Sequence, residues 1–203
     1  DKYKIDVGHQ HLIDIPQMVG SVDLAKLFAE LKFNYGAEIG VDRGEFSEVL
    51  CKSNPNLSLS CIDPWSDSAY ENGIPDKEAP FESYYREAIN RLAPYNVRIM
   101  RKTSAEALSD FEDNSLDFVY IEANHDFLNF TFDLHYWIKK VRPGGIVSGH
   151  DYVYYSYRKF NHVKRALIAY ARCYRMIPVF AVMRDPKGLK RDLYRSWFWV
   201  KDK

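Results

Sequence analysis

Short apolar runs alternate with amphipathic stretches along most of this chain, and that alternation constrains its fold more than any other feature. The apolar runs predict strands at 37–41, 57–62, 97–100, 116–121 and 145–148. Amphipathic stretches predict helices at 22–33, 45–53, 81–92, 104–110, 127–140 and 160–172. Strands and helices in this alternating order are typical of βαβ units, so we expect an α/β protein with a mainly parallel sheet.

The predicted sheet ends in a hairpin. Apolar runs at 176–182 and 194–200 are separated by the turn sequence Asp185–Gly188, which is too short to hold a crossover helix. These two strands are therefore expected to pair antiparallel, which brings the predicted sheet to seven strands. We interpret residues 1–203 as a single domain with residues 1–20 as an N-terminal extension.

Composition narrows the possible classes of protein. The chain has 203 residues, of which 46% are hydrophobic, so it can bury a full core and is not a disordered chain. Three widely spaced cysteines form neither a disulfide framework nor a CxxC metal site. No run approaches the roughly 18 apolar residues of a membrane span. We therefore expect a reducing, cytoplasmic location and no membrane partner.

The formal net charge of zero conceals two opposed regions. Residues 1–152 carry 15 basic and 25 acidic side chains, whereas residues 153–203 carry 13 basic and 3 acidic ones. The acidic region favours a cationic ligand, and the basic region favours an acceptor or partner with negative charge.

A glycine-rich turn at Gly36–Leu50 is the strongest local motif. The predicted strand reaches Glu38, Gly40 and Gly44 bracket a turn, and a helix begins near Glu45. Such a turn lets a ligand approach the backbone at the carboxyl end of a strand. The spacing is E-x-G-x-x-x-G and not the G-x-G-x-x-G that binds a pyrophosphate, and the acid Asp42 also favours a neutral or cationic ligand.

Two later segments extend the same predicted crevice. Asp63 follows the second strand, where a carboxylate can accept both hydroxyls of a ribose; the less favoured alternative is a helix cap or turn former before Pro64. The sequence TSAEAL begins a helix at Thr103 and fits a capping box. Ser104 and Ala105 would flank an adenine ring at that position.

The ordered segments GAEIGVDRG, CIDPW, TSAEA, LDFVYIEANH and RPGGIVSGHDY resemble the class I S-adenosylmethionine-dependent methyltransferases. The last two segments resemble the small catechol-type O-methyltransferases in particular. This resemblance implies a Rossmann-like three-layer α/β/α sandwich with the family strand order 3-2-1-4-5-7-6. It also implies S-adenosylmethionine as cofactor, with contacts from Glu38, Gly40, Asp42, Gly44, Phe46, Asp63, Trp65, Ser104, Ala105 and Glu122.

Acids and histidines at the ends of the fourth and fifth strands carry the expected chemistry. Glu122 and Asp151 end neighbouring strands, and two carboxylates there offer hard oxygen ligands for Mg²⁺ or another divalent cation. By the resemblance, His125 takes the place of the general base, with His150 and Asp151 as further catalytic candidates. Two departures from the catechol-type pattern are Glu122 in place of the usual Asp, and Tyr152 in place of an amide ligand.

The methyl acceptor is predicted only by class. The run Tyr152, Tyr154, Tyr155 and Tyr157 suits an aromatic or sugar-like substrate, and it is equally consistent with a packed loop. Trp65 and Tyr70, in the irregular stretch 64–80, are candidates for a lid over the cofactor. Basic residues at Arg158, Lys159, Lys164, Arg165, Arg172 and Arg175 favour either a solvated helix face or an acidic ligand.

Three other functions remain open on the sequence. A nucleic-acid methyltransferase would use the basic C-terminal segment, but no base-flipping motif of the Asn-Pro-Pro-Tyr type is present, so this partner is disfavoured. An NAD(P)-dependent oxidoreductase is disfavoured by the missing G-x-G-x-x-G. A binding module without turnover is the third alternative. We expect a small-molecule acceptor and allow for a homodimer.

Overall fold

A single eight-stranded sheet with helices on both faces forms the centre of the computed structural model, which describes residues 11–66, 80–154 and 161–202. The strand order is β1-β7-β8-β6-β5-β2-β3-β4. All neighbouring pairs are parallel except β6 with β8 and β7 with β8. The strands are β1 (Leu12–Val19), β2 (Tyr35–Ile39), β3 (Ser58–Ile62), β4 (Val97–Met100), β5 (Leu116–Ile121), β6 (Val141–Gly149), β7 (Val179–Met183) and β8 (Trp197–Val200).

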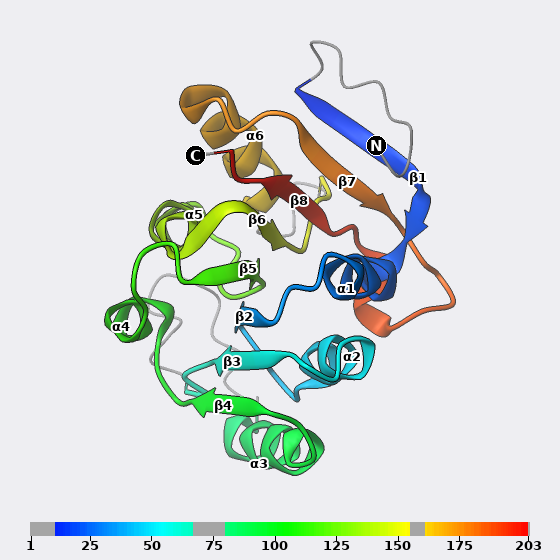
Figure 1. Cartoon of the computed structure of the whole chain (residues 1–203). Coiled ribbons are helices and arrows are strands. Elements are labelled where there is room, and N and C mark those ends of the chain that lie inside the picture. Colours follow the sequence, from blue (N-terminus) through cyan, green and yellow to red (C-terminus); the bar gives the residue numbers. More distant parts are fainter. Residues whose placement is uncertain (1–10, 67–79, 155–160, 203) are drawn as a thin grey trace.

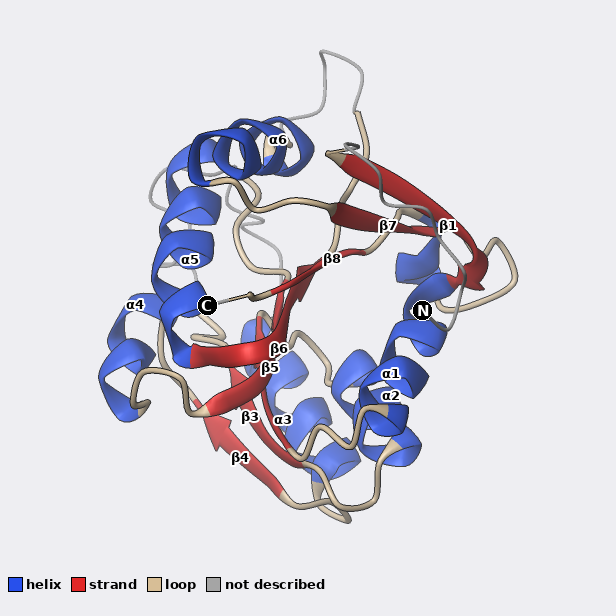
Figure 2. Cartoon of the chain, turned by 45° about the horizontal axis from the view of Figure 1, so that its top comes forward, coloured by secondary structure: helices blue, strands red, loops and turns tan. Residues whose placement is uncertain are grey.

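Helices cover the two faces of the sheet and complete a three-layer α/β/α sandwich (Figures 1 and 2). One face carries α1 (Gly20–Glu30), α2 (Glu45–Ser53) and α3 (Phe81–Leu92). The other carries α4 (Ser104–Ala107), α5 (Phe127–Lys140) and α6 (Val163–Tyr174), with a short 3-10 turn η2 (Leu108–Asp110) after α4. A second such turn, η3 (Lys190–Leu193), lies between β7 and β8.

Apolar strand residues alternate between the two faces and divide the core into two clusters. On β5, for example, Phe118 and Tyr120 join the cluster under α1 and α2, while Val119 and Ile121 join the one under α5 and α6. Strands buried on both faces have near-continuous apolar sequences, which is why these runs were predictable.

The predicted Rossmann-like α/β class and the C-terminal hairpin are confirmed, but the strand count is eight rather than seven. The additional strand is β1, which lies within the segment expected to be an N-terminal extension and pairs parallel with β7. Ile13, Ile15 and Met18 of β1 are buried. Its pairing partner is more than 160 residues away in sequence and Pro16 interrupts its pattern, so local sequence gave little sign of a strand.

The other seven strands follow the order that the family resemblance implies, with β1 added at the edge beside β7. No helix among the described residues is long and apolar enough to span a membrane.

Candidate active site

The carboxyl ends of β2, β5 and β6 meet at the point where the direction of strand addition reverses. From β2 the chain adds β3 and β4 on one side, and it then returns to add β5 and β6 on the other. In open α/β sheets, ligands bind in the crevice outside the strand ends at such a switch point. The residues that directly follow these strands include Gly40, Glu122 and His150.

The glycine turn after β2 packs tightly against the end of β5. Gly40 has a φ of +88°, and a Cβ atom on it would overlap the carbonyl oxygen of Glu122. Gly44 has a φ of +75° and is the N-cap residue of α2, and its amide donates to the Val41 carbonyl at 2.9 Å. Only glycine has the freedom and the small size for position 40, so the turn can pack directly against the end of β5.

Asp63 holds this turn in place. One carboxylate oxygen accepts the amides of Val41 at 2.9 Å and Asp42 at 3.0 Å, and the other accepts the amide of Trp65 at 2.7 Å. Burial raises the pKa of Asp63, and the backbone hydrogen bonds oppose that rise. A carboxylate has about four acceptor positions, so at most about one remains for a ribose hydroxyl.

The remaining candidates near β2 differ in accessibility. Glu38 is fully buried and accepts a hydrogen bond from the Ser47 hydroxyl of α2, whereas Asp42 is exposed on the turn. Phe46, which was expected to contact the cofactor, is 1% exposed and packs on Tyr120 with ring centroids 4.4 Å apart. Phe46 therefore lies in the core on the α2 face of the sheet.

Trp65, which the sequence suggested as part of a lid, lies beside the glycine turn. Its side chain is buried, its indole N–H donates to the Asp42 carbonyl at 2.7 Å, and its ring packs on Tyr85. Tyr70, the other lid candidate, lies outside the described residues.

The start of α4 forms the predicted capping box. Thr103 accepts the Glu106 amide, and the Glu106 carboxylate accepts the Thr103 amide at 2.8 Å. Ser104 is the first residue of α4 and is half-buried. Ala105 is exposed.

Beyond β5 and β6, the four predicted acidic and histidine residues form one connected cluster. His125 Nε2 lies 3.1 Å from Asp151 Oδ2, and His150 Nδ1 lies 3.2 Å from both Glu122 Oε1 and Asp151 Oδ1. Asp151 is buried with a φ of +58°, a left-handed conformation that costs a non-glycine residue free energy and is often found at functional sites.

The environment shifts the proton affinities of this cluster. Burial lowers the pKa of His125 below its ordinary value and outweighs the opposing effect of the nearby Asp151 charge. Burial by itself would raise the pKa of Asp151, but the nearby imidazoles of His150 and His125 lower it. At neutral pH the pair is therefore a neutral imidazole beside a carboxylate, the arrangement of a general base and its orienting group.

Asn161 belongs to this cluster, and sequence reasoning missed it. Its amide Nδ2 donates to Asp151 Oδ2 at 2.7 Å, and its carbonyl oxygen accepts the Val163 amide at 3.0 Å at the start of α6. An Asn two residues before a helix was the only available signal. Next to it, His162 donates its backbone amide to the His125 carbonyl at 2.8 Å and accepts the Phe127 amide through Nδ1.

The donor set does not fit the Mg²⁺ or Ca²⁺ ion that the sequence suggested at Glu122 and Asp151. These cations take six or more ligands, nearly all of them oxygens. Here an imidazole nitrogen lies close to both carboxylates, and the second oxygen of Asp151 already contacts His125 and Asn161. Within the described ranges, no group of three His, Cys, Asp or Glu side chains is arranged to hold an ion.

The aromatic and basic candidates divide between core and surface. Tyr152 is 1% exposed and belongs to the core, while Tyr154 is 60% exposed. Lys164 of α6 lies over both rings, 4.3 Å and 4.2 Å from their centroids. Arg158, Lys159, Tyr155 and Tyr157 lie outside the described residues. An apolar groove of about 430 Å³ lies between α5 and α6. None of the predicted site residues is among the described residues that line it.

Comparison with known proteins identifies the class. Residues 37–152 match a family model described as a methyltransferase domain, and this match covers more than half of the chain. The chain therefore belongs to this methyltransferase family, in agreement with its resemblance to the class I S-adenosylmethionine-dependent enzymes. An uncharacterized protein, y4gI of Sinorhizobium fredii, is 34% identical over 124 residues. The match covers 56% of this chain but only 12% of that much longer relative.

Solved structures share the fold at low sequence identity. The O-methyltransferase TomG from Streptomyces achromogenes, in complex with SAM, is 21% identical with a TM-score of 0.59, covering 89% of this chain and 79% of TomG. An O-methyltransferase from Bacillus cereus in complex with SAH is 17% identical with a TM-score of 0.60, covering 89% and 80%. The N-methyltransferase NodS from Bradyrhizobium japonicum is 15% identical with a TM-score of 0.58, covering 90% and 95%.

Proposed function

We propose that this protein transfers a methyl group from S-adenosylmethionine to an oxygen of a small molecule, with a nitrogen acceptor as the alternative. The observation that carries this proposal is the His125–Asp151 pair at the ends of β5 and β6. The glycine turn packs against the same end of β5. A base beside a ligand crevice is the arrangement that methyl transfer to a hydroxyl requires.

The cofactor would bind at the ends of β2, β3 and β4. S-adenosylmethionine supplies an electrophilic methyl group on a cationic sulfonium. Gly40 lets the turn after β2 pack directly against the end of β5, and the exposed Asp42 adds negative charge beside it. Asp63 orders the turn and has about one acceptor position for the ribose, while Ser104 and Ala105 would flank the adenine. Glu38 would act through the buried hydrogen bond to Ser47 that fixes α2.

His125 would take the proton of the acceptor hydroxyl. Asp151 lies beside Nε2 and favours a proton there, so Nδ1 is the atom that accepts. Loss of that proton would leave the acceptor oxygen nucleophilic enough to take the methyl group that bound S-adenosylmethionine would supply, with S-adenosylhomocysteine as the leaving product. Asp151 stabilises the imidazolium that results, and Asn161 holds Asp151 in place.

The basic C-terminal region suggests the kind of acceptor. Lys164 lies over the exposed ring of Tyr154, which follows the acid cluster closely in the chain. An acceptor with an aromatic ring or a negative charge fits this surface. The buried thiols of Cys51 and Cys61 and the exposed one of Cys173 are all free, which supports a reducing, cytoplasmic location.

The decisive test is formation of S-adenosylhomocysteine with a panel of catechols, phenolic acids and sugars. His125→Ala should lower kcat by about 100-fold or more while leaving the affinity for S-adenosylhomocysteine unchanged. Because burial lowers the pKa of His125, the wild-type rate should stay level as the pH falls to about 6.5 and decline only below it. Wild-type turnover in His125→Ala would overturn the role of the base, and no turnover with any acceptor would favour the binding module.

We also propose that the reaction needs no divalent cation, because His150 lies between the two carboxylates that would bind one. Protein treated with EDTA should keep its full rate, and added Mg²⁺ or Mn²⁺ should leave the rate unchanged. Elemental analysis of the purified protein should find less than one ion per chain. A loss of rate with EDTA that Mg²⁺ or Mn²⁺ restores would contradict this proposal.

A further inference from the structure

A lysine in the first turn of α6 has no acidic partner among the described residues. Lys164 is half-buried, and its ammonium lies 4.3 Å from the ring centroid of Tyr152 and 4.2 Å from that of Tyr154. Within the described part of the chain this ammonium forms no hydrogen bond and no ion pair. Removing a charge from water without a counterion costs free energy, so this cation calls for an explanation.

A second cation lies against the same tyrosine ring. The guanidinium carbon of Arg195 is 5.6 Å from the ring centroid of Tyr152. Arg195 pairs with Asp14 of β1, so the acid in this neighbourhood is already taken. Burial lowers the pKa of Lys164, and the charge of Arg195 lowers it further while Asp14 opposes the change. An anion bound beside Lys164 would relieve this repulsion between two positive charges.

These cations lie beside the candidate active site, on the side away from the glycine turn. Tyr152 directly follows Asp151 after the end of β6, and Arg195 comes just before β8. Lys164 comes three residues after Asn161, whose amide Nδ2 donates to Asp151 Oδ2 at 2.7 Å. In the strand order β8-β6-β5-β2, β6 and β8 lie on one side of β5 and the glycine turn of β2 lies on the other. The cations are therefore placed to meet the methyl acceptor rather than the cofactor.

We propose that Lys164 is a specificity-determining residue that binds a carboxylate of the methyl acceptor. This inference rests on the proposed function, in which the acceptor hydroxyl gives its proton to His125. The ammonium of Lys164 supplies the charge, and the exposed ring of Tyr154 offers an apolar surface to an aromatic acceptor. The next residues in the chain, 155–160, have the sequence YSYRKF, which contains two cations and no acid. Hydroxylated aromatic carboxylates are therefore the expected class of acceptor.

The experiment measures the binding of protocatechuate and of its neutral amide by calorimetry. The protein is first saturated with S-adenosylhomocysteine, so that no methyl group is transferred during the measurement. The wild type should bind the carboxylate about 10-fold more tightly than the amide. Lys164→Met should bind the two compounds equally and should keep the wild-type affinity for the amide. Lys164→Arg retains the positive charge, so it should keep a preference of about 3-fold or more.

A matched control separates this role from a structural one. Lys139→Met removes another lysine that lies over a tyrosine ring, 4.9 Å from the centroid of Tyr136, in the last turn of α5. This variant should bind both compounds as the wild type does. Added salt should weaken the binding of the carboxylate to the wild type and leave the binding of the amide unchanged. If Lys164→Met fails to fold, Lys164→Gln removes the same charge with a polar side chain.

The outcomes distinguish the two proposals. If the wild type binds S-adenosylhomocysteine but shows no preference for the carboxylate, or binds neither probe, the role of Lys164 is wrong and the proposed function stands. A preference that survives in Lys164→Met would overturn the inference in the same way. Equal weakening of both compounds in Lys164→Met would instead assign this lysine a structural role. If the wild type does not bind S-adenosylhomocysteine, the proposed function itself fails.

Discussion

At the scale of single residues, two glycines with similar backbone angles are required for different structural reasons. Gly40 and Gly44 both have φ near +80°, a conformation that side chains rarely adopt. A Cβ on Gly40 would overlap backbone atoms of Glu122, whereas a Cβ on Gly44 would lie 3.1 Å from the flexible Leu92 side chain. Position 40 therefore requires glycine both for its backbone conformation and because there is no room for a side chain. Position 44 requires glycine mainly for its backbone conformation.

This difference predicts unequal effects of alanine. Gly40→Ala should lower the free energy of unfolding by about 3 kcal/mol or more, because the β2 turn and the end of β5 must move apart. Gly44→Ala should cost about 1–2 kcal/mol. Urea unfolding of the two variants measures the difference, and equal costs would contradict the role of the Glu122 carbonyl.

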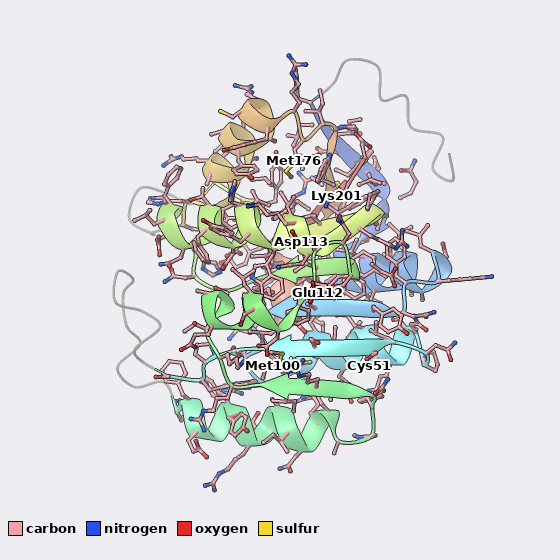
Figure 3. All side chains as sticks on the ribbon, turned by 60° about the vertical axis from the view of Figure 1, so that its left-hand side comes forward. Cys51, Met100, Glu112, Asp113, Met176 and Lys201 are labelled. Carbon is pink, nitrogen blue, oxygen red and sulfur yellow. The ribbon has the colours of Figure 1, made fainter. Side chains whose placement is uncertain are left out.

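At the scale of elements, a buried lysine joins β8 to the end of α5. Lys201, labelled in Figure 3, is 7% exposed just after β8. Its ammonium donates to the carbonyls of Val141 at 2.6 Å and Ile138 at 3.1 Å and to the side chain of Asn114 at 2.9 Å. A positive charge at a helix C-terminus is favourable, so this contact stabilises the connection between α5 and β6.

Replacing Lys201 should destabilise the fold, although this residue lies 63 positions after Ile138 of α5 in the sequence. Lys201→Met should lower the free energy of unfolding by about 2–4 kcal/mol, because it removes the buried ammonium that donates to the two carbonyls. Lys26→Met is the matched control, since the Lys26 side chain is 61% exposed and only pairs with Asp23 on the surface. The control should change stability by about 0.5 kcal/mol at most. Similar losses in both variants would contradict the prediction.

At the scale of the whole molecule, the sheet brings together segments from opposite ends of the sequence. β1 adds to the edge of the sheet beside β7, and Arg195 pairs with Asp14 of β1. Asp192 of η3 accepts the Ser21 amide at 2.7 Å, so the segment between β7 and β8 also secures the start of α1. Contacts between the two ends of the described chain therefore stabilise this edge of the sheet.

Asp133 lies in the middle of α5 and is 2% exposed. The pH dependence of the free energy of unfolding tests the effect of burying its carboxyl group. Burial raises the pKa of Asp133 from 3.8 to about 7, so between these values the folded protein holds a proton that the unfolded chain releases. The contribution of this group to stability is therefore complete below about pH 4 and is lost as the pH rises to about 7. Asp133→Asn has no such group, so its stability relative to the wild type should increase from pH 5 to pH 7.5 by up to a few kcal/mol. Urea unfolding across this range measures the difference, and a constant difference would contradict the prediction.

The sequence by itself determined the features that depend on neighbouring residues. Apolar runs predicted the seven strands from β2 to β8 because strands buried on both faces need continuous apolar sequence. The capping box at Thr103 and the glycine turn at Gly40 were predictable because both are local. Glu122 and Asp151 were expected in one cleft because neighbouring parallel strands end at the same edge of a sheet.

Only the tertiary structure decided what those residues contact. It added β1, buried Phe46 and Trp65, and brought Asn161 to Asp151. It also placed the His150 imidazole near both carboxylates that had suggested a cation. The physical reason is that a side chain's burial and partners depend on contacts between segments distant in sequence, and no local pattern of residue types encodes those contacts.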